Sequence, residues 1–220
     1  MVKLNLELRH RAKPNESYDE KHTRFLESIA DLGTPWNLEG LMPLPDIGSE
    51  LVISVSLDKI LGAGVKGNIT YKYRSEKYLE DNAQFDDHIQ IDFNEGKISL
   101  NEIIRILKSY IPAFDCYRAT LRNWNITKSD WAKIVEESNN TGKDVNGRDG
   151  VYRINPINYF DRELCLRAFG LSPEQITQRL EGKVESVSLL HDGVLLIYST
   201  LPVEQGNFDN IDEEVKRLLQ

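Results

Sequence analysis

The sequence predicts an α+β protein with a mostly antiparallel sheet, or sheets, flanked by about five helices. Three observations favour this class. Short runs with alternating apolar residues, typical of strands, interleave with segments of helical periodicity. Several strand runs are joined by short turns, which indicates hairpins. The strands and helices also lack the regular alternation of a doubly wound parallel sheet.

The first elements follow from apolar spacing and capping signals. Residues 2–9 alternate leucines and are expected to form a strand. Ser17 and Glu20 fit a capping box, so a helix is expected from there to about Leu32, before Gly33. Further strands are expected at 51–57, 69–75 and 86–93, followed by a tight turn at 94–97.

The middle of the chain predicts two helices around a strand. Ser99 and Glu102 form a second capping-box pair, and Pro112 is expected to end that helix. A strand is expected at 116–124. The next helix, at 127–140, is expected to be capped by Thr127 or Ser129 and to turn Trp131 and Ile134 inward.

The last part of the chain has clear start and stop signals. The segment 151–160 is expected to be extended, and Pro156 argues against a central strand there. A helix starts at Ser172, where an N-cap serine, an N1 proline and an N3 glutamine succeed one another. The other expected elements are a helix at 161–170, a hairpin at 184–199 with Asp192-Gly193 as its turn, and a helix at 210–220.

Length and composition narrow the functional classes. The 220 residues suit a single domain over 1–220, with a division near 95–115 as the alternative. A net charge of −8 argues against direct binding of nucleic acid; it fits a basic partner or solubility alone. No apolar run suggests a membrane span, the N-terminus lacks a signal peptide, and two distant cysteines indicate reduced thiols. A cytoplasmic protein is expected, and no cofactor is indicated.

The loop "TGKDVNGRDGVYR", residues 141–153, resembles a phosphate-binding pattern in its letters. A phosphate cradle needs a strand before it and a helix after it, and here the order is reversed. As a calcium loop it places Arg148 at the third ligand position and Asn155 where a glutamate is required. A solvent-exposed loop is therefore the favoured interpretation.

A second pattern, Asp92, Glu95 and Lys97, is similar to the acid and lysine set of metal-dependent nucleases. Gly96 separates Glu95 from Lys97 in an expected turn, so a charged hairpin tip is the favoured interpretation. Further acids for such a site would come from Asp81, Asp86 or Asp87. Neither the histidines nor the cysteines carry a catalytic signature, and an enzyme is not expected.

Aromatic residues crowd the region around the loop, together with charges of both signs. Tyrosine, tryptophan and arginine are enriched at protein interfaces, so binding is favoured over catalysis. The candidate partner-binding residues are Asp144, Arg148, Asp149, Tyr152, Arg153 and Tyr159.

The segment "GRDGVYRINPINYFDRELCLRAFGLSPEQI", with the opening "LNLELRHRAKP", resembles small bacterial immunity proteins of polymorphic or type VI secreted toxin systems. The nearest family is immunity protein 52, whose members are α+β and pair with restriction-type nuclease toxins. The resemblance implies a cytosolic antitoxin that neutralises a cognate toxin, such as a basic nuclease effector, by occluding its active site or substrate path. The alternatives are a metal-dependent nuclease using Asp92, Glu95 and Lys97, and a phage or secretion-system adaptor.

Overall fold

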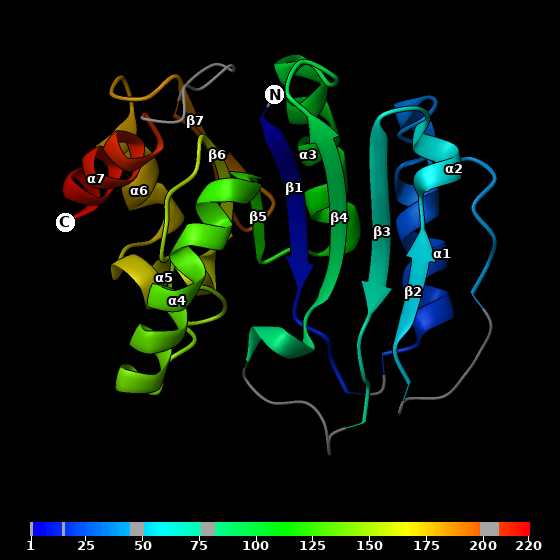
Figure 1. Cartoon of the computed structure of the whole chain (residues 1–220), viewed down its shortest axis with the longest axis horizontal. Helices are drawn as coiled ribbons and strands as arrows, with labels where there is room; N and C mark the ends of the chain where they lie inside the picture. Colours follow the sequence, from blue (N-terminus) through cyan, green and yellow to red (C-terminus); the bar gives the residue numbers. More distant parts are fainter. Residues whose placement is uncertain (1, 15, 45–50, 76–81, 199–206) are drawn as a thin grey trace. The chain divides into compact units, whose positions relative to one another are not determined.

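The computed structural model describes residues 2–14, 16–44, 51–75, 82–198 and 207–220. It confirms the α+β class, with seven α-helices and eight strands in the order β2-β3-β4-β1-β5-β6-β8-β7 among these residues (Figure 1). The chain divides into two compact units, one of residues 6–116 and one of residues 2–5 and 117–220. Their boundary lies just past the 95–115 range in which a division is the alternative to a single domain.

The first unit packs helices on an antiparallel β2–β3–β4 arrangement. Buried residues alternate along β4, as the sequence predicts, so one face of this strand lies in the core. Phe25 of α1 meets Tyr110 and Phe114 of α3 with ring centroids 5.2 and 5.4 Å apart. The elements are β1 (Lys3–His10), α1 (Tyr18–Ser28), β2 (Ile53–Ser56), α2 (Asp58–Leu61), β3 (Val65–Tyr71), β4 (Asp87–Asn94) and α3 (Leu100–Phe114), with 3₁₀ turns at Ala30–Leu32 and Ala83–Phe85.

Both predicted N-caps of this unit are confirmed, but both helix ends differ from expectation. The hydroxyls of Ser17 and Ser99 each accept the backbone N–H three residues later. Helix α1 ends at Ser28, and a 3₁₀ turn covers the stretch to Leu32. Helix α3 passes through Pro112 to Phe114. The expectation that Pro112 ends the helix was therefore wrong. A proline in the last turn removes only one helical hydrogen bond, and the packing of α3 tolerates this loss.

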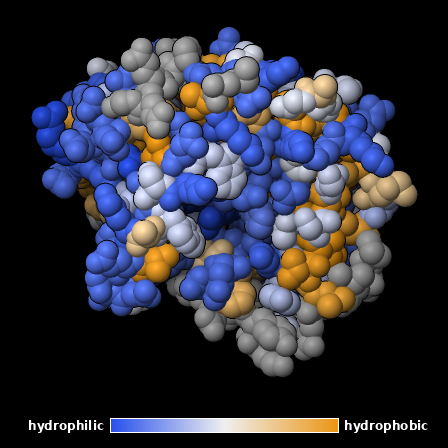
Figure 2. All heavy atoms as spheres, viewed as in Figure 1, coloured by the Kyte–Doolittle hydropathy of each residue, from blue (hydrophilic) through white to orange (hydrophobic). Residues whose placement is uncertain are grey.

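Strand β2 lies at the end of the strand order and is shorter than expected. Beside it, Leu51 and Val52 remain exposed, and Figure 2 shows hydrophobic surface over this strand. Strand β3 begins at Val65, earlier than the expected residue 69, and the four-residue helix α2 was not expected. Gly62 and Gly64 have φ of 84° and 86°, so the glycine-rich stretch makes the turn between α2 and β3.

The second unit surrounds the antiparallel set β5–β6–β8–β7 with helices. Its core includes Phe160, Leu164, Ile176, Phe208 and Val215, contributed by β6, α5, α6 and α7. The elements are β5 (Arg118–Asn123), α4 (Trp124–Thr141), β6 (Ile157–Asp161), α5 (Arg162–Phe169), α6 (Pro173–Leu180), β7 (Ser186–Leu190), β8 (Gly193–Ile197) and α7 (Asn207–Leu219). The capping box of α6 is confirmed, and α5 ends at Phe169 with Gly170 as its C-cap.

Strand β6 is central in this unit, against the expectation that Pro156 disfavours such a position. All five of its residues are buried between β5 and β8. Pro156 lies just before the strand, where its carbonyl accepts the Tyr198 N–H at 2.8 Å and no N–H is required of it. The hairpin is also shifted by one residue, because Gly193 already belongs to β8. A Cβ there would lie 2.1 Å from the Phe160 carbonyl oxygen, so close strand approach requires glycine.

Helix α4 begins earlier than expected, with Asn123 as its N-cap in place of Thr127 or Ser129. Ile134 is buried as predicted, but Trp131 is 62% exposed, so its inward orientation was wrong. The buried face runs through Asp130 and Ile134, which lie four positions apart. Trp131 follows Asp130 directly and is rotated by about 100° from it. Among the described residues, no helix is long and apolar enough to cross a membrane.

Candidate functional site

The loop after α4 is packed against its own unit, so the expectation of a solvent-exposed loop is wrong for residues 144–151. Arg118 donates to the carbonyl and the side-chain oxygen of Asn146 at 2.8 and 3.0 Å. Asp149 accepts the Asp144 N–H at 2.9 Å and pairs with Arg167 at 3.0 Å. Polar groups that the sequence offers as candidate phosphate or calcium ligands therefore stabilise the conformation of the loop itself.

The six predicted partner-binding residues lie in three places: the loop itself, the surroundings of α7, and strand β6. Asp144, Arg148 and Asp149 come together within the loop, where Arg148 is buried and donates its backbone N–H to Asp144 at 3.3 Å. Tyr152 and Arg153 lie beside α7: the Lys216 ammonium is 5.8 Å from the Tyr152 ring centroid.

Arg153 is held by two acids of its own unit. It pairs with Asp130 at 2.5 Å and with Asp209 at 2.7 Å. The hydrogen bonds that Arg153 donates to Asp130 raise the pKa of Arg153, against the effect of burial. Tyr159, in β6, is fully buried and donates its hydroxyl to Asp192 at 2.9 Å. Tyr159 therefore has no surface to offer a partner.

The residues of the nuclease alternative surround the tip between β4 and α3. Asp92 lies in β4, and Glu95 and Gly96 form the turn, with φ of 83° at the glycine. Lys97 is exposed and lies against Gly64. Among the described residues, the one group of three or more possible metal ligands excludes Asp92 and Glu95. Of the supporting acids, Asp86 and Asp87 are buried, and Asp81 lies outside the described residues.

The two cysteines are buried and free, as expected. Burial raises the pKa of Cys116 well above its usual range and that of Cys165 to about 12. A thiol held in this way is neutral at physiological pH and is a poor nucleophile.

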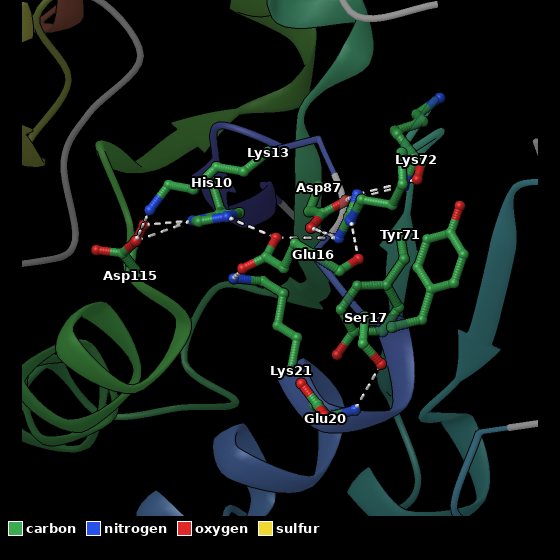
Figure 3. Close-up of polar contacts among 12 residues, drawn as sticks. His10, Lys13, Glu16, Ser17, Glu20, Lys21, Tyr71, Lys72, Asp87 and Asp115 are labelled. Carbon is green, nitrogen blue, oxygen red and sulfur yellow. Dashed lines mark hydrogen bonds and ion pairs between the residues drawn. The ribbon is translucent and has the colours of Figure 1, made fainter. Parts of the chain in front are cut away.

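The group of possible metal ligands that the first unit does contain is His10, Glu16 and Asp87. It belongs to a larger cluster, the Glu16 network, which we define as His10, Glu16, Lys21, Arg74 and Asp87. The five residues come from the end of β1, the approach to α1, α1 itself, the segment after β3, and the start of β4. Figure 3 shows Glu16 in the middle, with His10, Lys21 and Asp87 around it.

Arg74 and Asp87 form the innermost pair of the network. The guanidinium donates to both carboxylate oxygens, at 2.9 and 2.6 Å, and side-chain exposure is 1% for Arg74 and 0% for Asp87. Burial alone would lower the pKa of Arg74, but the hydrogen bond and the charge of Asp87 raise it. Arg74 also lies 3.4 Å from the Glu16 carboxylate and therefore links the two acids.

The Glu16 carboxylate lies beside three other members of the network, His10, Lys21 and Arg74. It lies 3.3 Å from His10 Nε2 and 3.5 Å from Lys21 Nζ. Burial alone would raise the pKa of Glu16, but the hydrogen bond and charge of His10, with Lys21 and Arg74, lower it to about 2. Burial lowers the pKa of Lys21, although the charge of Glu16 opposes this.

His10 connects the network to the end of α3. Its Nδ1 lies 2.7 Å from the Asp115 backbone carbonyl, and its Nε2 faces Glu16. Both neighbours are hydrogen-bond acceptors, so the ring lies between two oxygen atoms. At the rim, the Asp115 carboxylate is half exposed and pairs with Lys13 at 2.9 Å.

The charges of the Glu16 network argue against a metal centre. Two carboxylates face two fixed cations, Lys21 and Arg74, and a divalent ion would have to displace them in a buried site. The network instead ties together strands and helices of the first unit. Sequence reasoning missed it because its members are far apart in the chain; Glu16 and Arg74 are 58 positions apart.

The second unit presents a different cluster on α4, at the surface. Trp131 is 62% and Val135 39% exposed, and Lys128 is also exposed on the same helix. Trp124, half buried at the start of α4, has Lys3 Nζ 5.7 Å and the Arg122 guanidinium 5.5 Å from its ring centroid. We call these six residues the α4 patch. The positions 124, 128, 131 and 135 form one stripe of the helix, a spacing that the sequence itself carries.

A comparison of the chain with models of known protein families finds no match, and a comparison with curated proteins finds none that is similar. The resemblance to immunity proteins therefore stays a prediction.

Proposed function

We propose that the protein binds a cognate protein toxin and neutralises it by covering the toxin's active site or substrate path. The observation that carries this proposal is the α4 patch. Trp131 exposes most of its side chain, together with Val135, on one stripe of a long helix. Exposed tryptophan is unfavourable in water, and tryptophan is among the residues that dominate binding energy in protein interfaces.

The placement of the other candidate groups supports a binding role. In the loop 142–153, Asp149 pairs with Arg167, and in the Glu16 network Arg74 pairs with Asp87, so these charges organise the fold. The α4 patch differs from them because its apolar side chains face solvent. A net charge of −8 would further speed encounter with a toxin of positive net charge.

The test is to co-express the full chain with the toxin encoded by the neighbouring gene. We expect the chain to restore growth, and Trp131→Ala to reduce both protection and affinity by about tenfold or more. Leu166→Ala is a matched control, because Leu166 is another exposed apolar residue, 51% exposed on α5. Failure of the unaltered chain to protect the cells would contradict the proposal.

A further inference from the structure

Strand β2 has one free edge in the first unit. It lies at the end of the strand order, and among the described residues it pairs with β3 alone. The Leu57 N–H donates to the Gly67 carbonyl at 2.8 Å. In an antiparallel pair, every second residue bonds the neighbouring strand and the residues between them point their backbone groups the other way. The N–H and C=O groups of Ser54 and Ser56 therefore point away from β3, and the same alternation extends to Val52.

This edge is exposed and uncharged. Ser54 and Ser56 are exposed, as are Leu51 at 52% and Val52 at 40%, and Figure 2 shows hydrophobic surface over the strand. The segment 51–57 contains no charged residue and no proline, and its register against β3 has no bulge. Natural edge strands use such features against association, because an open row of backbone groups pairs readily with another strand. Strand β2 is therefore open to the addition of a strand.

The other end of the strand order, β7, has charged residues beside it. Lys183 and Glu185 are exposed just before Ser186, the first residue of that strand. Charged side chains next to an edge oppose its pairing with another strand, because they would lose contact with water. Of the two ends of the strand order, β2 is therefore the one that favours association.

A second copy of the chain matches this edge. The outward-pointing positions are spaced evenly around Ser54, so two β2 strands can pair antiparallel about a twofold axis at Ser54. This register places Val52 opposite Ser56 of the second copy. It also places the half-buried side chains of Ile53 and Val55 opposite each other, as a favourable pair of β-branched residues. The segment brings no charged side chain to the contact, so the net charge of −8 opposes it only from a distance.

We infer that two copies of the chain associate through β2, as an antiparallel strand pair with its twofold axis at Ser54. This inference goes beyond the proposed function and does not depend on it. An extended segment of another protein would meet the same backbone groups, but β2 already supplies the spacing and the uncharged side chains that pairing with itself requires. The pair forms up to about six hydrogen bonds between the two strands. Because the strand is short, the association is weak and depends on concentration.

Sedimentation velocity of the purified full chain tests the association. Between about 1 and about 500 µM, the mean mass should rise from that of one copy towards that of two. Ser54→Lys places two like charges opposite each other at the axis and should raise the midpoint concentration by at least about tenfold. Ser186→Lys is the matched control, because it adds the same charge at an exposed position of β7, and its effect should stay below about twofold.

Single cysteine variants test the register. Under mild oxidation, Ser54→Cys should give a disulfide-linked dimer, because the two copies of residue 54 would lie about 5.5 Å apart between their Cα atoms. Ser56→Cys is the matched control. Ser56 is exposed on the same face of β2, but its two copies would lie about 13 Å apart along the strands, beyond the reach of a disulfide. The unaltered chain, whose own cysteines are buried, gives the baseline, and circular dichroism checks that each variant is folded.

Three results would overturn the inference. The first is a chain that stays monomeric over the whole concentration range. The second is an effect of Ser186→Lys as large as that of Ser54→Lys, which would indicate pairing of β2 with β7. The third is cross-linking of Ser56→Cys as efficient as that of Ser54→Cys. A monomeric chain that still protects cells from the toxin would reject this inference and leave the proposed function intact.

Discussion

The Glu16 network and the α4 patch both contain lysine and arginine, but they differ in what surrounds these cations. In the network, Arg74 and Asp87 are buried and form two hydrogen bonds with each other. In the patch, Trp131 is 62% exposed. A dense cluster of titratable groups is therefore not in itself a site of function, because charges that neutralise one another inside a unit stabilise its fold. Exposed aromatic surface is the stronger indication of a partner.

The two regions should also respond differently to substitution. Removing one member of a buried ion pair leaves the other charge without compensation, which is strongly destabilising. Truncating an exposed side chain changes folding little and affects only what binds to it. The following predictions use this contrast, from the largest expected effect on stability to the smallest.

Asp87→Ala should destabilise the protein by about 3–5 kcal/mol, because it leaves the buried Arg74 guanidinium without its carboxylate. Urea denaturation followed by circular dichroism measures the change. A loss below about 1 kcal/mol would show that Arg74 finds water or another acid, and that the network is less enclosed than its geometry indicates.

The contribution of Glu16 to stability should depend on pH. Its pKa is lowered from the usual 4.5 to about 2 in the folded protein, so the unfolded chain takes up the proton first on acidification. The stabilisation is complete above about pH 4.5 and is lost as the pH falls towards about 2. This contribution to the free energy of unfolding is on the order of 3 kcal/mol.

The measurement is the free energy of unfolding against pH for the unaltered chain and for Glu16→Gln. The difference between the two curves should shrink between about pH 4.5 and about pH 2. A difference that is independent of pH in this window would contradict the assigned charge interactions of Glu16.

Lys13→Ala removes an ion pair at the rim of the network and should change stability by less than about 1 kcal/mol. Lys13 and Asp115 are 60% and 51% exposed, and water screens their attraction. The same denaturation assay applies. A loss of stability as large as that of Asp87→Ala would contradict this prediction, because it would show that Lys13 contributes as much as the buried members of the network.

Trp131→Ala should change the free energy of unfolding by less than about 0.5 kcal/mol, although it removes the largest exposed side chain of α4. Thermal unfolding measures this change in stability, and binding to the toxin, as described above, measures the effect of the substitution on affinity. A large loss of stability would show that Trp131 packs within its unit, and the contrast between the two regions would then disappear.

Much of the fold could be predicted from local signals in the sequence. The capping pairs at Ser17, Ser99 and Ser172 mark where helices begin, because each serine acts within one turn of the backbone. The alternation in β4 likewise shows its buried face. Errors arose at Pro112 and Pro156, where tertiary packing or a position just outside the ladder made a proline acceptable.

The candidate sites were less predictable than the fold. The loop 142–153 reads as exposed because it is polar, yet its residues 144–151 fold back on their own unit through Arg118, Asp149 and Arg167. Trp131 is predicted to lie in the core because it is aromatic, yet its side chain faces solvent. Both errors have one cause: residue type gives an average preference for burial, whereas position on a helix or loop decides the individual case.

The sequence by itself determined the α+β class, most of the helix starts and the charge of the chain, since each depends on neighbouring residues or on composition. Only the tertiary structure decided which charges neutralise one another and which aromatic residues stay exposed. Glu16 meets Arg74, and Lys3 meets Trp124, across long stretches of chain. Such pairs form because folding brings distant elements together, and the order of residues along the chain carries no local signal for them.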